Sequence, residues 1–213
     1  MEIRVRGDCV EIEGYVNAVE RKSRPLMSRM GRFIERICKG AFNRALNRGK
    51  NVNLLLNHDD SKVYANTRDG SLKLNEDNIG LHARAVVHDA DFADKARAGE
   101  FVGWSFGFND VKNGVECKRD EDGFPLRDVH DLDLEEVSIL DRSKTPAYDG
   151  TLVAVRSEEE QIFFGENFCD EIQIRELPEE ELTQEESVPK QQETVEKNIN
   201  YDKWDALIAD MKN

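Results

Sequence analysis

The sequence lacks the features that would place it in several common classes of protein. No apolar run approaches the roughly 18 to 20 residues that cross a bilayer, and the charged, alternating start MEIRVRGDCVEIEG is unlike a secretory signal. The four cysteines and four histidines form neither a CxxC nor an HxxxH pair. We therefore expect reduced thiols, no metal site and no membrane partner.

An excess of basic residues is also absent. The chain of 213 residues has a formal net charge of −14. Residues 157–213 hold 17 acidic and 5 basic residues, which leaves 27 acidic and 25 basic residues in 1–156. A nearly neutral body does not attract phosphate and an acidic tail repels it, so we expect no nucleic-acid partner.

The same patterning predicts two regions, a folded body over 1–156 and a tail over 157–213. The tail is rich in Glu and Gln and has little periodicity, which is typical of disorder. Its end differs, because a helix at 201–211 would place five apolar residues on one face. These residues are Tyr201, Trp204, Leu207, Ile208 and Met211. Such a helix is typical of a docking peptide; the alternative is a helix that packs on its own body.

Within the body, short apolar stretches alternate with turn signals such as Asp69-Gly70 and Asp122-Gly123. A capping Asp89 or Asp91 and a stop at Gly99 predict one short helix. The stretch RFIERICKGAFNRALNRG fits either one helix, or a strand to about Cys38 followed by a helix over 41–48.

About eight strands, without regularly spaced helices between them, predict a mainly β fold of the α+β kind. We expect a closed, barrel-like sheet decorated by a few short helices. A doubly wound α/β sheet is not expected, because it needs a helix of ten or more residues between successive strands.

Two places in the body offer the groups of a nucleophilic mechanism. His58 follows the apolar run NLLL, and Ser105 lies between aromatic residues with Gly103 and Gly107 two positions away on either side. The glycines would let another chain approach the backbone. The ordinary alternatives are a strand-end histidine that faces solvent and a serine on the polar face of a strand.

The third place is Glu135-Glu136 within LDLEEVSILD. On a regular strand one of the two carboxylates must lie beside apolar neighbours, where it needs a partner; a bulge at the pair is the alternative. A serine becomes a nucleophile when a neutral imidazole removes its proton, and a carboxylate on the far ring nitrogen fixes the imidazole. No spacing rule demands this grouping.

The string G-x-S-x-G around Ser105 also fits the nucleophile elbow of an α/β-hydrolase. An elbow needs a helix after the serine, and FGFNDVKNGVECK has turn residues and no helical face. That fold also requires a histidine last in the chain, and only His130 lies downstream. We therefore reject this fold.

The body resembles the prohead (capsid maturation) protease family of tailed bacteriophages, which is related to the herpesvirus assemblins. An NHD after an apolar strand, a G-x-S-x-G-F after a short helix, and an EVS strand followed by TPAY occur in the order of the family. The matching stretches cover about residues 10–155. They are EGYVNAVE, RFIERICKGAFNRAL, LLLNHDD, GSLKLNEDNIGLHARAVV, RAGEFVGWSFGF and LDLEEVSILDRSKTPAYDGTLVAV.

The resemblance implies a serine endopeptidase with no cofactor, in which Ser105 is the nucleophile and His58 the base. The third member maps less directly, because the related viral enzymes use a second histidine there and EVSIL has none. Glu136 is our choice and Glu135 the fallback. For the oxyanion hole, we expect donors from backbone amides near Gly103 and Gly107 or from Arg142.

The resemblance also implies the setting and the partners. The enzyme would act in the host cytoplasm, inside the assembling procapsid. Its substrates would be the scaffold or a scaffold-like arm of the major capsid protein, and finally the enzyme itself. A homodimer is a candidate state, because the related viral proteases work as dimers. The alternative function is a non-catalytic capsid-assembly or scaffold component with a protease-like body. A cysteine-dependent enzyme is a weaker third class.

Overall fold

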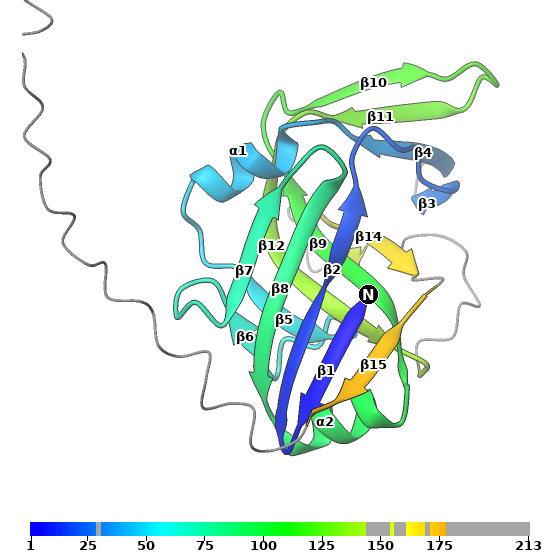
Figure 1. Ribbon diagram of the computed structural model, residues 1–213. Coiled ribbons are helices and arrows are strands. Elements are labelled where there is room, and N and C mark those ends of the chain that lie inside the picture. The colour runs from blue at the N-terminus through cyan, green and yellow to red at the C-terminus, as the bar shows by residue number, and fades with distance from the viewer. Residues whose placement is uncertain (29–30, 144–153, 156–160, 169–170, 178–213) are drawn as a thin grey trace, which may run out of the picture. The chain divides into compact units, whose positions relative to one another are not determined.

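The structure, a computed structural model, describes residues 1–28, 31–143, 154–155, 161–168 and 171–177. They lie within the unit Met1–Glu179 and form three sheets and two short helices (Figure 1). The expectation of a mainly β fold is confirmed. The helix expected at 201–211 lies outside the described residues.

The first sheet has five strands in the order β15-β1-β2-β8-β7. They are β1 (Glu2–Arg6), β2 (Cys9–Ala18), β7 (Leu72–Glu76), β8 (Gly80–His88) and β15 (Gln173–Glu176). Apolar and polar residues alternate along β1 and β2, so that Ile3, Val5, Val10 and Ile12 are buried on one face. This alternation is typical of the half-buried antiparallel pair that β1 and β2 form.

A second sheet has six strands in the order β13-β14-β9-β12-β5-β6. They are β5 (Asn53–Leu56), β6 (Ala65–Asn66), β9 (Phe101–Asp110), β12 (Leu132–Asp141), β13 (Ala154–Val155) and β14 (Gln161–Phe168). β12 lies between β9, which is antiparallel to it, and β5, which is parallel. β12 therefore joins two segments that are far apart in the sequence.

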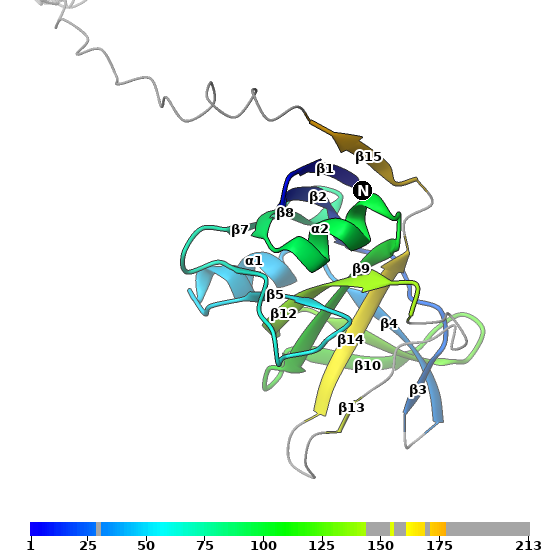
Figure 2. The same cartoon turned by 90° about the horizontal axis from the view of Figure 1, so that it is seen from below.

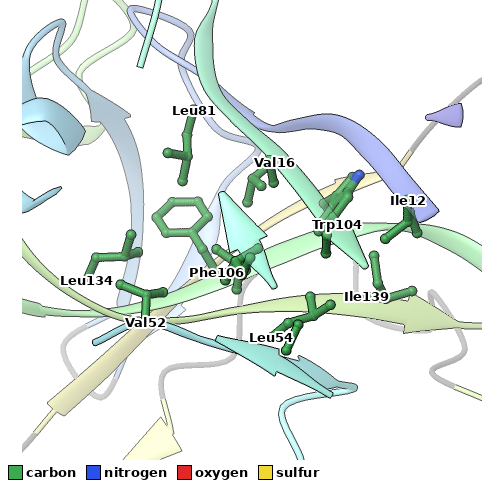
Figure 3. Close-up of a cluster of buried hydrophobic side chains, with 14 of the residues drawn as sticks. Ile12, Val16, Val52, Leu54, Leu81, Trp104, Phe106, Leu134 and Ile139 are labelled. Atoms are coloured by element: carbon green, nitrogen blue, oxygen red, sulfur yellow. The ribbon is translucent and has the colours of Figure 1, made fainter. Parts of the chain in front are cut away.

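The core lies between these two sheets (Figure 3). Trp104 and Phe106 of β9 and Ile139 of β12 point toward Ile12 and Val16 of β2, and all five are buried. Because side chains alternate along a strand, the residues between these core positions project from the opposite face of the six-stranded sheet. That outer face carries the residues with candidate chemistry.

The third sheet, in the order β10-β11-β4-β3, contains a buried glutamate. Its strands are β3 (Leu26–Ser28), β4 (Gly31–Ile37), β10 (Val115–Arg119) and β11 (Pro125–Val129). Glu35 of β4 lies 3.6 Å from Arg127 of β11, which also pairs with Asp110 at 2.6 Å. Burial raises the pKa of Glu35 to about 7, although the Arg127 charge acts to lower it.

The ends of both helices are set by residues close to them in the sequence. The Asp89 side chain accepts a hydrogen bond from Phe92 N at 2.9 Å and caps α2 (Ala90–Arg97), and Gly99 follows with φ +67°. For the stretch before Gly49, the expectation of a strand to about Cys38 followed by a helix over 41–48 is correct, and that of a single helix is wrong. β4 ends at Ile37, Gly40 turns the chain with φ +86°, and α1 (Ala41–Asn47) begins. Neither helix has the length or apolar character of a membrane span.

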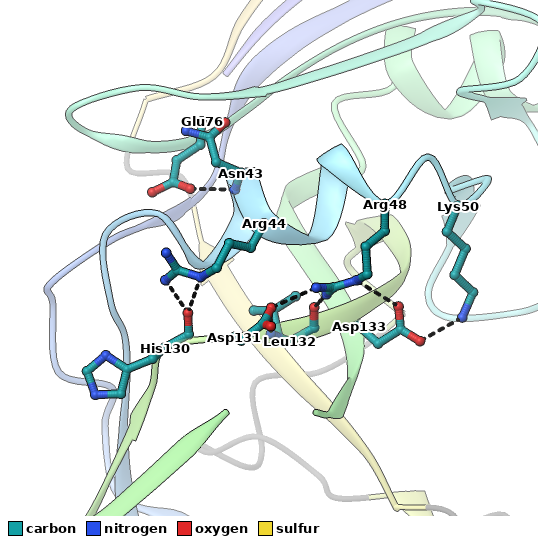
Figure 4. Close-up of polar contacts among 9 residues, drawn as sticks. All are labelled: Asn43, Arg44, Arg48, Lys50, Glu76, His130, Asp131, Leu132 and Asp133. Carbon is teal, nitrogen blue, oxygen red and sulfur yellow. Dashed lines mark hydrogen bonds and ion pairs between the residues drawn. The ribbon is translucent and has the colours of Figure 1, made fainter. Parts of the chain in front are cut away.

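Basic residues of α1 and the loop after it fix the start of β12 (Figure 4). Arg44 donates to the carbonyl oxygen of His130, and Arg48 Nη1 donates to Asp131 Oδ1 at 2.9 Å. Lys50 Nζ lies 3.2 Å from Asp133 Oδ2. Exposed ion pairs contribute little individually, but together these contacts hold the start of β12 against the helix.

Two expectations need correction. Closure of a barrel requires a continuous ladder around the sheet; no such closure is found among the described strands, which divide among three sheets (Figure 2). The boundary expected after Arg156 comes too early, because β14 pairs with β9 and β15 pairs with β1. The unit that contains them extends to Glu179.

Removing the charge of Glu35 should change how stability depends on pH. Because its folded-state pKa is raised above the ordinary value of 4.5 to about 7, the folded state binds the proton more tightly. The group therefore destabilises the protein as pH rises through that window, by about 3 kcal/mol in full. We expect Glu35→Gln to gain up to that amount relative to the unchanged chain between pH 5 and pH 8, measured by urea unfolding. The matched control is the exposed Glu121→Gln; a stability difference that does not vary with pH would contradict this account.

Candidate active site

His58 lies in a tight reversal directly after β5. Asp59 N donates to Leu56 O at 3.0 Å and closes the reversal around Asn57 and His58. Both central residues are left-handed, with φ +54° at Asn57 and φ +63° at His58, the pattern of a type I′ turn. Asparagine tolerates this conformation better than most residues, whereas a left-handed histidine is uncommon. Strain of this kind persists only where the surroundings hold it.

β12 supplies the contacts that hold the turn. Asn57 N donates to Ile139 O at 2.8 Å, and Asp141 N donates to Asn57 Oδ1 at 3.0 Å. His58 N donates to Ser138 Oγ at 3.2 Å. Three hydrogen bonds from one strand therefore fix the backbone that carries the imidazole.

Asp141 ends β12, and its buried carboxylate forms an ion pair with the half-buried Lys95. Its carboxylate lies 3.0 Å from Lys95 Nζ of α2 and accepts a hydrogen bond from Ser143 N at 2.9 Å. Burial acts to raise the pKa of Asp141, but hydrogen bonds from Ser143 and Asn57 and the contact with Lys95 outweigh it and hold the pKa well below its usual range. The strand end beside the turn is thus anchored to a helix.

The two adjacent glutamates have different partners. The register between β12 and β9 shifts between Leu134 and Glu136, so a bulge lies at Glu135. Glu135 Oε1 bonds Lys50 Nζ at 2.6 Å and Asn109 Nδ2 at 2.8 Å. Glu136 is buried, and its Oε1 lies 2.7 Å from His58 Nδ1. The bulge and the buried, partnered carboxylate, which the sequence offered as alternatives, occur together, and the carboxylate next to His58 is that of Glu136.

Ser105 is on the same outer face of the sheet. It lies directly opposite Ser138 across the β9–β12 ladder, and its neighbours Trp104 and Phe106 point into the core. The side chain is fully buried. Its hydroxyl makes no hydrogen bond to another described residue.

The structure thus brings together residues from three segments. His58 and Glu136 are hydrogen-bonded, and Ser138, which contacts both, is the cross-strand neighbour of Ser105. Within the described residues the link from Ser105 to His58 is not formed as a hydrogen bond. In unliganded enzymes the bond between nucleophile and base is often long and tightens only with substrate. Sequence reasoning missed Ser138, because its position depends on the register of two strands.

The oxyanion candidates differ in what their surroundings allow. β9 is an inner strand, with Gly103 opposite Leu140 on one side and Gly107 opposite Glu136 on the same side, while β14 flanks the other edge. Backbone amides in an inner strand are mostly used by the ladders, but each glycine pairs beside a register shift of the β9–β12 ladder, where pairing is interrupted. Amides near Gly103 and Gly107 therefore stay candidates, as does Arg142, which is exposed beyond the end of β12.

One cluster outside this site has metal-ligand chemistry. The ligand atoms of Cys38, Asp128 and His130 lie within 4.8 Å of one another. The Asp128 carboxylate, however, accepts two hydrogen bonds from Arg36 at 2.9 and 2.7 Å and contacts Lys118. Burial raises the pKa of the Cys38 thiol. Two cations on the carboxylate and a thiol that resists ionisation make a poor cation site.

A family model described as caudovirus prohead serine protease matches residues 1–163. This range includes His58, Ser105 and Glu136, and it ends within β14. Comparisons with curated proteins and with solved structures found no match.

Replacing Asn57 should separate backbone preference from side-chain contacts in the turn. Asn57→Gly keeps access to φ +54° but loses the hydrogen bond from Asp141 N, so we expect a loss of about 1 kcal/mol of unfolding free energy. Asn57→Ala loses the same bond and also meets the left-handed penalty, about 1 kcal/mol more. Urea unfolding measures both; an alanine variant as stable as the glycine variant would show that the turn is not strained as described.

Proposed function

The chain belongs to the caudovirus prohead serine protease family, and from that premise we propose that it is a serine endopeptidase of capsid maturation that uses Ser105, His58 and Glu136. The family implies a serine peptidase, and the hydrogen bond of 2.7 Å between His58 Nδ1 and Glu136 Oε1 is the observation that carries the assignment of residues. It lies on the face that also carries Ser105.

In the proposed mechanism Glu136 fixes the tautomer of His58. An ionised carboxylate only accepts hydrogen bonds, so His58 Nδ1 carries the proton and Nε2 is left as the base. Ser105 Oγ attacks the scissile carbonyl carbon while its proton passes to Nε2. The imidazolium then protonates the leaving amine as the C–N bond breaks, and water hydrolyses the acyl-enzyme by the same steps.

The substrates follow from the setting that the family implies. We propose that the enzyme acts inside the procapsid in the host cell, on scaffold or on a scaffold-like arm of the major capsid protein, and on itself. Confinement raises the effective concentration of substrate, so weak peptide binding suffices. A homodimer and a role of the tail in retention within the capsid belong to the same proposal.

One observation favours a second candidate function. Ser105 has no exposed surface, and a substrate carbonyl must reach its hydroxyl. A chain that never opens this site would act as a non-catalytic assembly or scaffold component with a protease-like body. The two functions differ in whether Ser105 is needed for cleavage.

Expression of the full chain with and without Ser105→Ala distinguishes them. We expect the unchanged chain to trim itself, and the variant to lose at least about 10⁴-fold in rate because the nucleophile is removed. Mass spectrometry of the products measures the trimming, and co-expression with the capsid and scaffold proteins of the same phage supplies the assembly context. Fragments that persist in the variant would remove Ser105 as the nucleophile, and an intact chain in the assembly context would favour the scaffold function.

The two glutamates provide a matched pair for the third role. Glu136→Gln places an amide beside His58 Nδ1, which favours the wrong tautomer, and we expect a loss of about 10⁴-fold in trimming rate. Glu135→Gln changes a group that bonds Lys50 and Asn109, and we expect a rate within twofold of the unchanged chain. Equal losses of trimming rate in the two variants would mean that Glu136 does not orient His58 in catalysis.

A further inference from the structure

The Ser138 hydroxyl contacts two members of the proposed catalytic group at once. The side chain is fully buried. Its Oγ donates to Glu136 Oε2 at 2.6 Å and accepts from His58 N at 3.2 Å. A serine hydroxyl has one proton to donate and lone pairs to accept, so both contacts are satisfied by a single orientation.

These contacts also distinguish the role of Ser138 from that of Ser105. The two serines face each other across the β9–β12 ladder and both are fully buried. The proton of Ser138 is held by the Glu136 carboxylate, whereas Ser105 has no described hydrogen-bond partner. Ser138 is therefore poorly placed to act as a nucleophile.

We infer that Ser138 is a positioning residue that holds the His58 imidazole and the Glu136 carboxylate in a fixed mutual geometry. The inference rests on the proposed peptidase function and adds a residue to it. Glu136 then accepts a hydrogen bond on each oxygen, from His58 Nδ1 and from Ser138 Oγ, so the carboxylate cannot rotate without losing one of them. The hydrogen bond from His58 N to Ser138 Oγ attaches the left-handed turn to the same hydroxyl.

Loss of the Ser138 hydroxyl removes a hydrogen bond from the Glu136 carboxylate and another from the His58 backbone amide. The carboxylate can rotate, and the amide of His58 loses its partner inside a turn that depends on its surroundings. The imidazole then spends less time with Nε2 toward the nucleophile. Small misplacements of reacting groups cost up to about 10²-fold in rate.

The first experiment measures the rate of self-trimming of the full chain. We expect Ser138→Ala to slow trimming by about 10- to 100-fold, and Ser138→Thr, which keeps the hydroxyl, to restore most of the rate. The matched control is Ser71→Ala. Ser71 also accepts a backbone N–H, that of Asn66, and donates to an aspartate, Asp69, but in a turn that contacts neither His58 nor Glu136. Its rate should stay within twofold.

The second experiment has a readout that does not need activity. In the Ser105→Ala chain, which stays intact, ¹⁵N chemical shifts of labelled histidine report the tautomer of His58. We expect one fixed Nδ1–H tautomer with serine or threonine at position 138, and averaging between both tautomers with alanine. If no variant trims, the proposed function fails while the tautomer measurement still decides the role of Ser138.

Ser138→Ala with an unchanged tautomer and a rate within twofold would overturn the inference. So would a threonine variant no better than alanine in fixing the tautomer. Should the alanine variant not fold, Ser138→Cys, close in size and a weaker donor, takes its place with the same expected results.

Discussion

The pairing of β12 with β9 on one side and with β5 on the other is the constraint on which the site depends. β12 is an inner strand, so its register fixes both neighbours. Its residues alternate in role: Val137 and Ile139 enter the core, whereas Glu136 and Ser138 contact His58 on the outer face. The core that stabilises the fold therefore also sets the positions of the polar groups, because each strand has only two faces.

The site combines features that each disfavour folding. A buried carboxylate needs partners to compensate for lost hydration, and two successive left-handed residues are strained. Glu136 finds its partners in His58 and Ser138, and the turn finds its own in β12 and in the anchored Asp141. The unfavourable local terms are thus offset by contacts from β12, whose alternate residues are buried in the core.

Much of this arrangement could be predicted from the sequence, and the rest depends on long-range pairing. The helix capped by Asp89 and the break at Gly40 were visible because caps and glycines act locally. His58, Ser105 and the pair Glu135-Glu136 stood out as residues, and the resemblance to a family implied the roles of His58 and Ser105. The register shift at Glu135, which decides between two adjacent glutamates, follows from pairing with β9 and has no local signal.

The dependence on long-range strand pairing also explains why the sequence alone places the end of the folded body too early, at Arg156. Residues 157–179 hold 8 acidic residues and 1 basic residue, so their composition alone is typical of a solvated tail. Yet this stretch contains β14, which pairs with β9 in the six-stranded sheet, and β15, which pairs with β1 at an edge of the five-stranded sheet; these neighbouring strands supply the order that the local sequence does not. The net charge therefore divides as −9 within Met1–Glu179 and −5 within Glu180–Asn213. The acidity belongs in larger part to the compact unit, so the expected lack of a nucleic-acid partner stays a prediction that now rests on the charge of that unit and not on a tail.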